Sequence, residues 1–299
     1  MFFLLVLYQQ FPLKQKKLIK KRQTLTNAGT SIVQVIRSGI ILFVLYRFLL
    51  MTIGVEQLGI WSIVLATTTV INISNLGLSG SVVKFVAKYI ARAELGNVSS
   101  VIQTAALSLG SLIGLVLLII YPLLQTLLEY IVPDSGLPDA LSVLPYALVS
   151  FWITAIAGIF QAGLDGCQRI DLRNILLIGN HLLYLGLAFL WVPSYGLLGL
   201  AYAQVFQASS ILIVSWFLLR WELKNLPLVP YHWHRNLFFE MLSYGINFQF
   251  VSIIGMLSDP LTKALLSKFG GLAMVGYYEM AYRMLSQFLA IMVNANQVL

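Results

Sequence analysis

The chain has 299 residues, of which 59% are hydrophobic and only 10% are charged, and its formal net charge is +8. Together with a mean hydropathy of +0.86, this composition excludes an ordinary soluble domain and predicts an integral membrane protein. No surface of interleaved aromatic and basic residues accompanies the positive charge. We therefore expect no nucleic-acid partner and expect membrane lipids with anionic headgroups to neutralise the loop charge.

The N-terminal region, residues 1–23, is distinct from the rest of the chain. Its first thirteen residues, MFFLLVLYQQFPL, are too short to span a bilayer, and we interpret them either as a mis-assigned start or as an interfacial anchor. Six basic residues follow between Lys14 and Arg22. A signal peptide has the reverse order, with charge before the apolar region, so we predict a cytoplasmic basic segment.

Eight apolar stretches of 18 to 26 residues follow. At about 1.5 Å per residue, such helices cross the roughly 30 Å hydrocarbon core of a bilayer, and nothing in the sequence resembles the alternating strands of a barrel. We therefore predict an all-α, polytopic membrane protein with about eight transmembrane helices. The stretches are Gly29–Ile53, Gly59–Val83, Ile102–Leu124, Val143–Leu164, Ile175–Val192, Gly196–Leu219, Leu242–Leu266 and Leu272–Gln297.

Lysine and arginine are distributed unevenly over the loops. Fourteen of the 19 basic residues lie before the first stretch or after the second, fourth and sixth, whereas the opposite loops hold only Lys268. The opposite loops also carry Glu56, Glu129, Asp134 and Asp139. Because positive loops stay in the cytoplasm, we predict a multi-pass protein of the inner (plasma) membrane with a cytoplasmic N-terminus.

The longest predicted inner loop, residues 220–241, mixes charges, two prolines and aromatic residues. We expect it to separate a six-helix N-terminal lobe, residues 24–219, from a partial C-terminal lobe of two helices, residues 242–299. The longest predicted outer loop, residues 125–142, is too small to form a catalytic domain.

The partial lobe reads as a second copy of the beginning. VEQLGIWSIVLA near the first outer loop matches LAMVGYYEMAYR when Gly59 is aligned on Gly276. Parallel repeats of six helices are a familiar transporter plan, with the substrate between the halves. On that plan twelve or more helices are expected, so we interpret this sequence as C-terminally truncated.

The segment QLGIWSIVLATTTVINISNLGLSGSVVKFVAKYIAR resembles the second-helix signature of Wzx-type polysaccharide and O-antigen flippases, in the multidrug/oligosaccharidyl-lipid/polysaccharide (MOP) exporter superfamily. GLDGCQRIDLRN, LSYGINFQ and VGYYEMAYR fit the same family. The resemblance implies alternating-access transport of undecaprenyl-diphosphate-linked oligosaccharides, the repeat units of O-antigen, capsule or exopolysaccharide. It also implies coupling to H⁺ or Na⁺, and other polysaccharide-assembly membrane proteins as partners.

Charged residues at membrane depth are expensive and usually face a cavity or a partner. Arg37 shares a helix face with Thr30 and Gln34, so we expect Arg37 and Gln34 to bind substrate; the planar guanidinium suits a diphosphate. The alternative is a structural pair between helices. Arg47 lies near the outer end of the same stretch, where snorkelling explains it.

Two acid–base pairs occupy the partial lobe at i, i+4 spacing: Asp259 with Lys263, and Glu279 with Arg283. We expect Asp259 and Glu279 to couple transport to an ion, and Lys263 and Arg283 to contact substrate. Pro260 removes a backbone donor and could give Asp259 access to the cavity. Mutual neutralisation within each helix is the competing interpretation.

Uncharged polar side chains favour a sugar ligand, because amides and phenols both donate and accept hydrogen bonds. We expect Asn72 and Asn75 to contact substrate, although such residues also hold neighbouring helices together. The wider set comprises Trp61, Thr68, Ser79, Asn180, Tyr184, Gln204 and Gln207.

The sequence lacks a nucleotide-binding glycine loop and a metalloprotease motif, so we expect no enzymatic activity, no cofactor and no metal site. Two other functions remain open. One is a multidrug or cation exporter of the same superfamily, whose cavity should be rich in carboxylates; here the basic spanning residues outnumber the acidic ones by four to two. The other is a membrane enzyme of the polysaccharide pathway, such as a polymerase or ligase, which needs a large outer loop.

Overall fold

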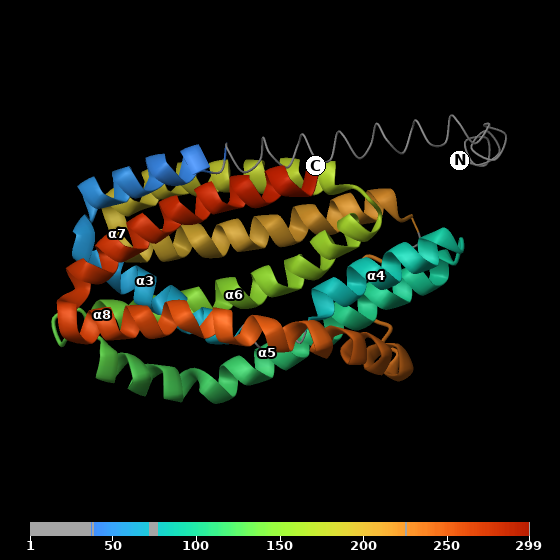
Figure 1. Ribbon diagram of the computed structural model, residues 1–299, viewed down its shortest axis with the longest axis horizontal. Helices are drawn as coiled ribbons and strands as arrows, with labels where there is room; N and C mark the ends of the chain where they lie inside the picture. The colour runs from blue at the N-terminus through green and yellow to red at the C-terminus, as the bar shows by residue number, and fades with distance from the viewer. Residues whose placement is uncertain (1–36, 38, 72–76, 225, 299) are drawn as a thin grey trace.

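The computed structural model describes residues 37, 39–71, 77–224 and 226–298, and all the regular structure in these ranges is α-helical (Figure 1). The elements are a short apolar helix Gly39–Thr52, then α3 (Gly54–Ile71), α4 (Leu78–Ala91), α5 (Leu95–Ile131), α6 (Leu137–Gly166), α7 (Ile170–Glu222) and α8 (Arg235–Val298). The prediction of an all-helical polytopic membrane protein is confirmed.

The two longest helices each contain two of the predicted spans. α7 is interrupted at Gly196 (φ 55°, ψ −131°) and α8 at Gly271 (φ 78°, ψ 173°). These backbone conformations are essentially restricted to glycine. The chain folds back at both positions, so the predicted fifth to eighth spans run as two antiparallel hairpins.

The helices differ from the predicted spans at three places. The second span is interrupted directly before α4, where Gly77 adopts the left-handed conformation. The predicted outer loop 125–142 is wrong in length, because α5 continues to Ile131 and α6 already begins at Leu137. A proline in the first turn of α6 costs no hydrogen bond there, so the Pro-rich sequence starts a helix instead of forming a long loop. The predicted inner loop is also shortened, to residues 223–234.

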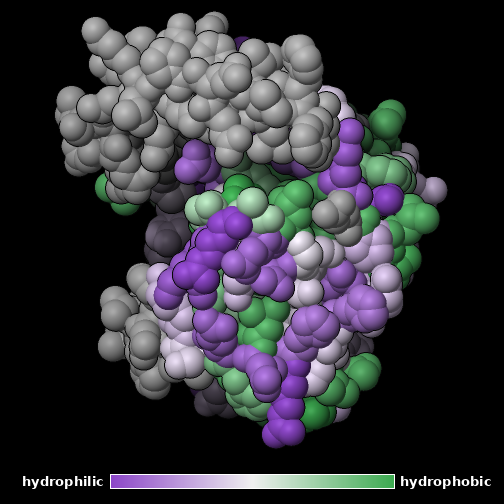
Figure 2. Space-filling model, turned by 90° about the vertical axis from the view of Figure 1, so that its right-hand side faces the viewer, coloured by the Kyte–Doolittle hydropathy of each residue, from purple (hydrophilic) through white to green (hydrophobic). Residues whose placement is uncertain are grey.

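α6 lies in the centre of the bundle, in contact with α3, α4, α5 and α7. Leucines on several helices are fully buried, while other large apolar side chains on α5 and α7 point outward. This outward apolar surface suits lipid, and three described helices, α5, α6 and α7, are long and apolar enough to cross a membrane. Hydrophilic residues gather at the end of the molecule where α4 joins α5 and α6 joins α7 (Figure 2).

Candidate functional site

The carboxylate of Glu279 on α8 is the centre of a buried polar network. Four groups reach it: the hydroxyls of Tyr46 (3.0 Å) and Ser62 (2.8 Å) donate hydrogen bonds, and Lys263 Nζ (2.7 Å) and Arg283 Nε (2.6 Å) pair with it. Glu279 itself is only 2% exposed. A buried carboxylate is stable only when it is paired and hydrogen-bonded, and this one is fully satisfied.

Lys263 joins the two predicted acid–base pairs into one network. Its ammonium lies 2.7 Å from Asp259 Oδ2 and 2.7 Å from Glu279 Oε2. The interpretation of two separate i, i+4 pairs was therefore incomplete, because the break at Gly271 folds the second half of α8 back against the first. Two cations and two anions leave the network without net charge, which limits the cost of burying it.

The network lies beside a close contact between α3 and α8. Gly59 packs against the backbone of Leu272 so tightly that an added Cβ would overlap the carbonyl oxygen, and Gly276 packs in the same way against Val55. Only glycine allows two backbones to approach in this way. The two contacts are reciprocal, since each glycine meets the residue four positions before the other.

The reciprocity agrees with the repeat inferred from the sequence. Gly276 follows Gly59 by the same 217 positions that separate Ser62 from Glu279, and Leu272 follows Val55 by the same interval. The turns also correspond: Gly54 has φ 81° and its equivalent, Gly271, has φ 78°. The two copies therefore meet across an approximate two-fold axis.

The copies differ in charge at this axis. At the same interval Tyr46 corresponds to Lys263 and Ser62 to Glu279, whereas Asp259 and Arg283 correspond to apolar residues of the first copy. All four charged groups of the network thus belong to α8, and the first copy contributes hydroxyl donors. Sequence reasoning missed Tyr46 and Ser62, because a lone hydroxyl in an apolar span carries no local signal.

The other predicted site residues have varied positions. Arg37 and Arg47 are exposed, and no carboxylate pairs with either within the ranges that the structure describes. Gln34, Asn72 and Asn75 lie outside those ranges. The Arg283 side chain is 42% exposed although it contacts Glu279, so one face of it remains accessible.

Several members of the predicted sugar-binding set are buried or engaged elsewhere. Trp61 is in the core, and the Thr68 hydroxyl bonds the carbonyl of Leu65 within its own helix. Gln207 donates to the backbone of Asn180, which links the two halves of α7. These contacts favour the helix-packing interpretation at those positions.

A second contact joins α4 to the start of α8. Gly77 packs closely against the backbone of Gly245, and the Ser81 hydroxyl donates to the Met241 carbonyl (2.7 Å). Lys88 also pairs with Glu240 at 3.5 Å. α8 therefore contacts both α3 and α4. No group of three His, Cys, Asp or Glu side chains suited to a metal occurs among the described residues.

Comparisons with known proteins give a consistent picture. Residues 24–299 match the family described as Polysaccharide biosynthesis protein. A comparison with curated protein sequences gave no match.

Solved structures of MOP-superfamily transporters share the fold. An inward-facing multidrug resistance MATE family transporter is 17% identical, with a TM-score of 0.68 over 91% of this chain and 60% of its own. A mutant of the Vibrio cholerae MATE transporter VcmN is 18% identical, with a TM-score of 0.67 over 93% of this chain and 67% of its own.

A MOP-superfamily transporter from Pyrococcus furiosus, described as having a binding pocket of reverse polarity, is 14% identical, with a TM-score of 0.70 over 93% of this chain and 63% of its own. This chain thus spans about three fifths to two thirds of the length of these structures. With a family match over nearly its whole length and the fold of MOP-superfamily membrane transporters, the chain belongs to the polysaccharide biosynthesis protein family.

Proposed function

We propose that this membrane transporter moves undecaprenyl-diphosphate-linked oligosaccharides across the inner membrane by alternating access, as part of polysaccharide biosynthesis. The observation that carries the proposal is the polarity of the charges at membrane depth. Both carboxylates, Asp259 and Glu279, are held by cations. The exposed charges are arginines: Arg37, Arg47 and the accessible part of the Arg283 side chain.

This polarity favours an anionic ligand over a cationic drug. A cation exporter needs an accessible carboxylate, whereas here the pairs with Lys263 and Arg283 would have to break first. A guanidinium can donate two parallel hydrogen bonds to phosphate oxygens, so Arg37 and Arg283 are our candidates for the diphosphate. Gln34, Asn72 and Asn75 are the candidates for the sugar. The Pyrococcus furiosus relative, whose pocket is described as reversed in polarity, gives the superfamily a precedent.

The network also offers a place for ion coupling. Asp259 Oδ1 is buried and has no hydrogen-bond partner among the described residues, while its Oδ2 holds Lys263. A proton or Na⁺ bound at Asp259 would compete with Lys263 for this carboxylate and would leave Lys263 paired with Glu279 alone. The network would then carry a net positive charge beside the contact between Gly59 and Gly276, and this change would bias the contact between its closed and open arrangements.

The orientation in this proposal rests on the charge bias of the loops, and the expected neighbours rest on the family. We place the N-terminus and residues 223–234 in the cytoplasm, because basic loops stay inside. Other membrane proteins of polysaccharide assembly are the expected neighbours. The small outer connection between α5 and α6, residues 132–136, gives little room for the active site of a polymerase or ligase.

The test compares two cargoes in one preparation. The protein is reconstituted in proteoliposomes with a fluorescent undecaprenyl-diphosphate oligosaccharide, or with the cationic dye ethidium. We expect movement of the lipid-linked sugar between leaflets and no transport of ethidium. Arg37→Ala should abolish movement at equal protein abundance, and Arg37→Lys should restore it only in part, since lysine lacks the bidentate fork. Ethidium transport without lipid movement would overturn the proposal.

Ion coupling has its own measurement. If Asp259 binds the coupling ion, Asp259→Asn should stop lipid movement even when Lys263→Met is added. If the two residues only neutralise each other, the double variant should recover what each single variant lost. Recovery in the double variant would remove Asp259 from the mechanism and leave the substrate proposal intact.

A further inference from the structure

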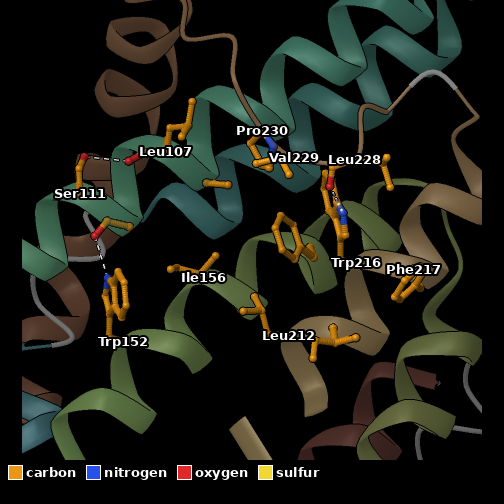
Figure 3. A pocket seen from close by; sticks show the side chains of 14 residues that line it. Leu107, Ser111, Trp152, Ile156, Leu212, Trp216, Phe217, Leu228, Val229 and Pro230 are labelled. Atoms are coloured by element: carbon orange, nitrogen blue, oxygen red, sulfur yellow. Dashed lines mark hydrogen bonds between the residues drawn. The ribbon is translucent and has the colours of Figure 1, made fainter. Parts of the chain in front are cut away.

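A cavity of about 570 Å³ lies between α5, α6 and α7, no residue of the Glu279 network lines it, and the segment between α7 and α8 closes one end of it. Figure 3 shows Leu107 and Ser111 of α5, Ile156 of α6 and Trp216 of α7 around the cavity, with Leu228, Val229 and Pro230 as its roof.

The polar atoms in the wall are already used. Trp152 Nε1 donates to the Gly110 carbonyl (2.8 Å), Trp216 Nε1 donates to the Leu228 carbonyl (2.9 Å), and the Ser111 hydroxyl donates to the Leu107 carbonyl (2.7 Å). These bonds leave ring faces and methyl groups as the lining. The occupant that such a wall accepts is a hydrocarbon chain.

The roof is fixed to α5 and does not depend on the cavity being filled. Gln103 Oε1 accepts the backbone N–H groups of both Tyr231 and His232 (3.1 Å each). Trp233 Nε1 donates to the Ser108 hydroxyl at 2.8 Å. The segment is thus held away from the space beneath it, which keeps that space open.

The charge of the segment complements an anionic headgroup. The two carboxylates that flank the segment, Glu222 at the end of α7 and Glu240 in α8, are paired with Arg169 (2.7 Å) and Lys88 (3.5 Å). Arg220, Lys224 and Arg235 remain, and none of them has a carboxylate partner in the described part of the chain. Each such cation near a membrane surface attracts anionic lipid.

The depth of the cavity selects a chain that stays within one leaflet. On α6 its lining runs from Trp152 to Phe160, which is about 12 Å of helix rise. Half of the hydrocarbon core is about 15 Å. A resident phospholipid fits this depth better than a carrier lipid whose long tail must pass between leaflets.

We propose that the cavity holds an acyl chain of an anionic phospholipid from the leaflet on the side of residues 223–234, with the headgroup against Arg220, Lys224 and Arg235. The lipid joins α5, α6 and α7 to the segment that connects the two lobes. It is a binding site separate from the transported substrate, and it does not depend on the identity of that substrate.

Native mass spectrometry of the purified protein, released from bilayers of phosphatidylglycerol and phosphatidylcholine, tests the site. We expect wild type to retain phosphatidylglycerol in preference to phosphatidylcholine. Lys224→Gln with Arg235→Gln should weaken that retention about thirtyfold, from two lost surface cations. Leu107→Trp should fill the cavity and abolish retention, whereas Leu115→Trp should retain the lipid, because Leu115 is exposed on the same helix outside the cavity.

Three results would overturn the proposal. One is equal retention of the two phospholipids by wild type. Another is equal retention by the Leu107→Trp variant and its Leu115→Trp control. The third is retention of added undecaprenyl phosphate in preference to phosphatidylglycerol, with the same sensitivity to Leu107→Trp, because it would assign the cavity to the carrier lipid. Thermal unfolding of each variant separates loss of the site from loss of the fold.

Discussion

The first helical hairpin of the chain and its repeat in α8 have the same backbone plan but opposite chemistry. Gly54 and Gly271 make equivalent turns, and Gly59 and Gly276 make equivalent close contacts. In the second copy the polar positions carry Lys263 and Glu279, whereas the first copy carries hydroxyls. The glycine contacts of the interface are therefore symmetric between the two copies, whereas its charges are not.

This difference separates the steric requirement of the contact from its electrostatic one. Close packing requires glycine in both copies, because a side chain at either position, Gly59 or Gly276, would push the two helices apart. Charged residues are tolerated in one copy only, because two carboxylates that face each other across the contact would repel in a low dielectric. Tyr46 and Ser62 satisfy Glu279 as neutral donors, so the interface can open without stranding a charge on the first copy.

The largest effect should come from the centre of the asymmetric network. Glu279→Leu leaves Lys263 and Arg283 with one carboxylate between them, and breaking a buried ion pair costs about 3–5 kcal/mol. We expect a marked fall in the free energy of unfolding, measured by denaturant titration in detergent. Glu129→Leu, at an exposed position, is the control. Equal stability of the two variants would show that the network contributes little.

A smaller effect should come from the neutral copy. Tyr46→Phe removes the hydroxyl that donates to Glu279 and keeps the ring, and a hydrogen bond to a charged group contributes about 1.5–3 kcal/mol. The same unfolding assay should register this loss. Adding Tyr46→Phe to Glu279→Leu should cost almost nothing more, because the partner is already absent. Full additivity would mean that Tyr46 acts through packing alone.

The symmetric glycine contacts predict that equivalent substitutions in the two copies lower the free energy of unfolding equally. Gly59→Ala and Gly276→Ala should each cost about 1–3 kcal/mol by overpacking, and the two values should agree closely because the contacts are reciprocal. Gly158→Ala has open space around the new methyl group and should be neutral or slightly stabilising. Unequal losses at Gly59 and Gly276 would contradict the two-fold relation.

Cysteine substitutions at exposed positions should leave stability unchanged, so labelling them tests the orientation in the membrane alone. Thr52 and Phe269 are exposed, lie beside the equivalent turns and are separated by the repeat interval, so cysteines at both positions should react with an impermeant maleimide in intact cells. Arg92→Cys, in the connection between α4 and α5, should not. Reaction at Arg92→Cys with silence at the other two would invert the topology.

The native thiol should not interfere with this labelling. Burial, with Glu222 nearby, raises the pKa of Cys167 to about 12. Maleimides react with the thiolate, which forms only as the pH approaches that value. Reaction at Cys167 should therefore be slow at pH 7, and its rate should rise with the thiolate fraction, about tenfold per pH unit, between about pH 7 and 9. Rapid labelling of the unsubstituted protein would show that Cys167 is accessible.

The sequence by itself determined the helices, the family and the repeat. Lipid requires long apolar segments, so the eight spans could be read locally, and the alignment of Gly59 on Gly276 placed two residues that proved to lie in reciprocal contacts. The pairs at i, i+4 were also local. Loop lengths were less well predicted, because polar ends of long helices remain helical beyond the hydrocarbon core, as α5 does to Ile131.

Only the tertiary structure decided how the charged groups combine. Tyr46 and Glu279 are 233 positions apart, and Ser62 and Glu279 are 217 apart. No spacing rule connects residues at such distances, since the turn at Gly271 and the packing of α3 on α8 bring them together. The cavity under Leu228 arises in the same way, from three helices and a connecting segment, each of which looks ordinary alone. Periodicity identifies which faces are polar, and only folding determines which polar faces meet.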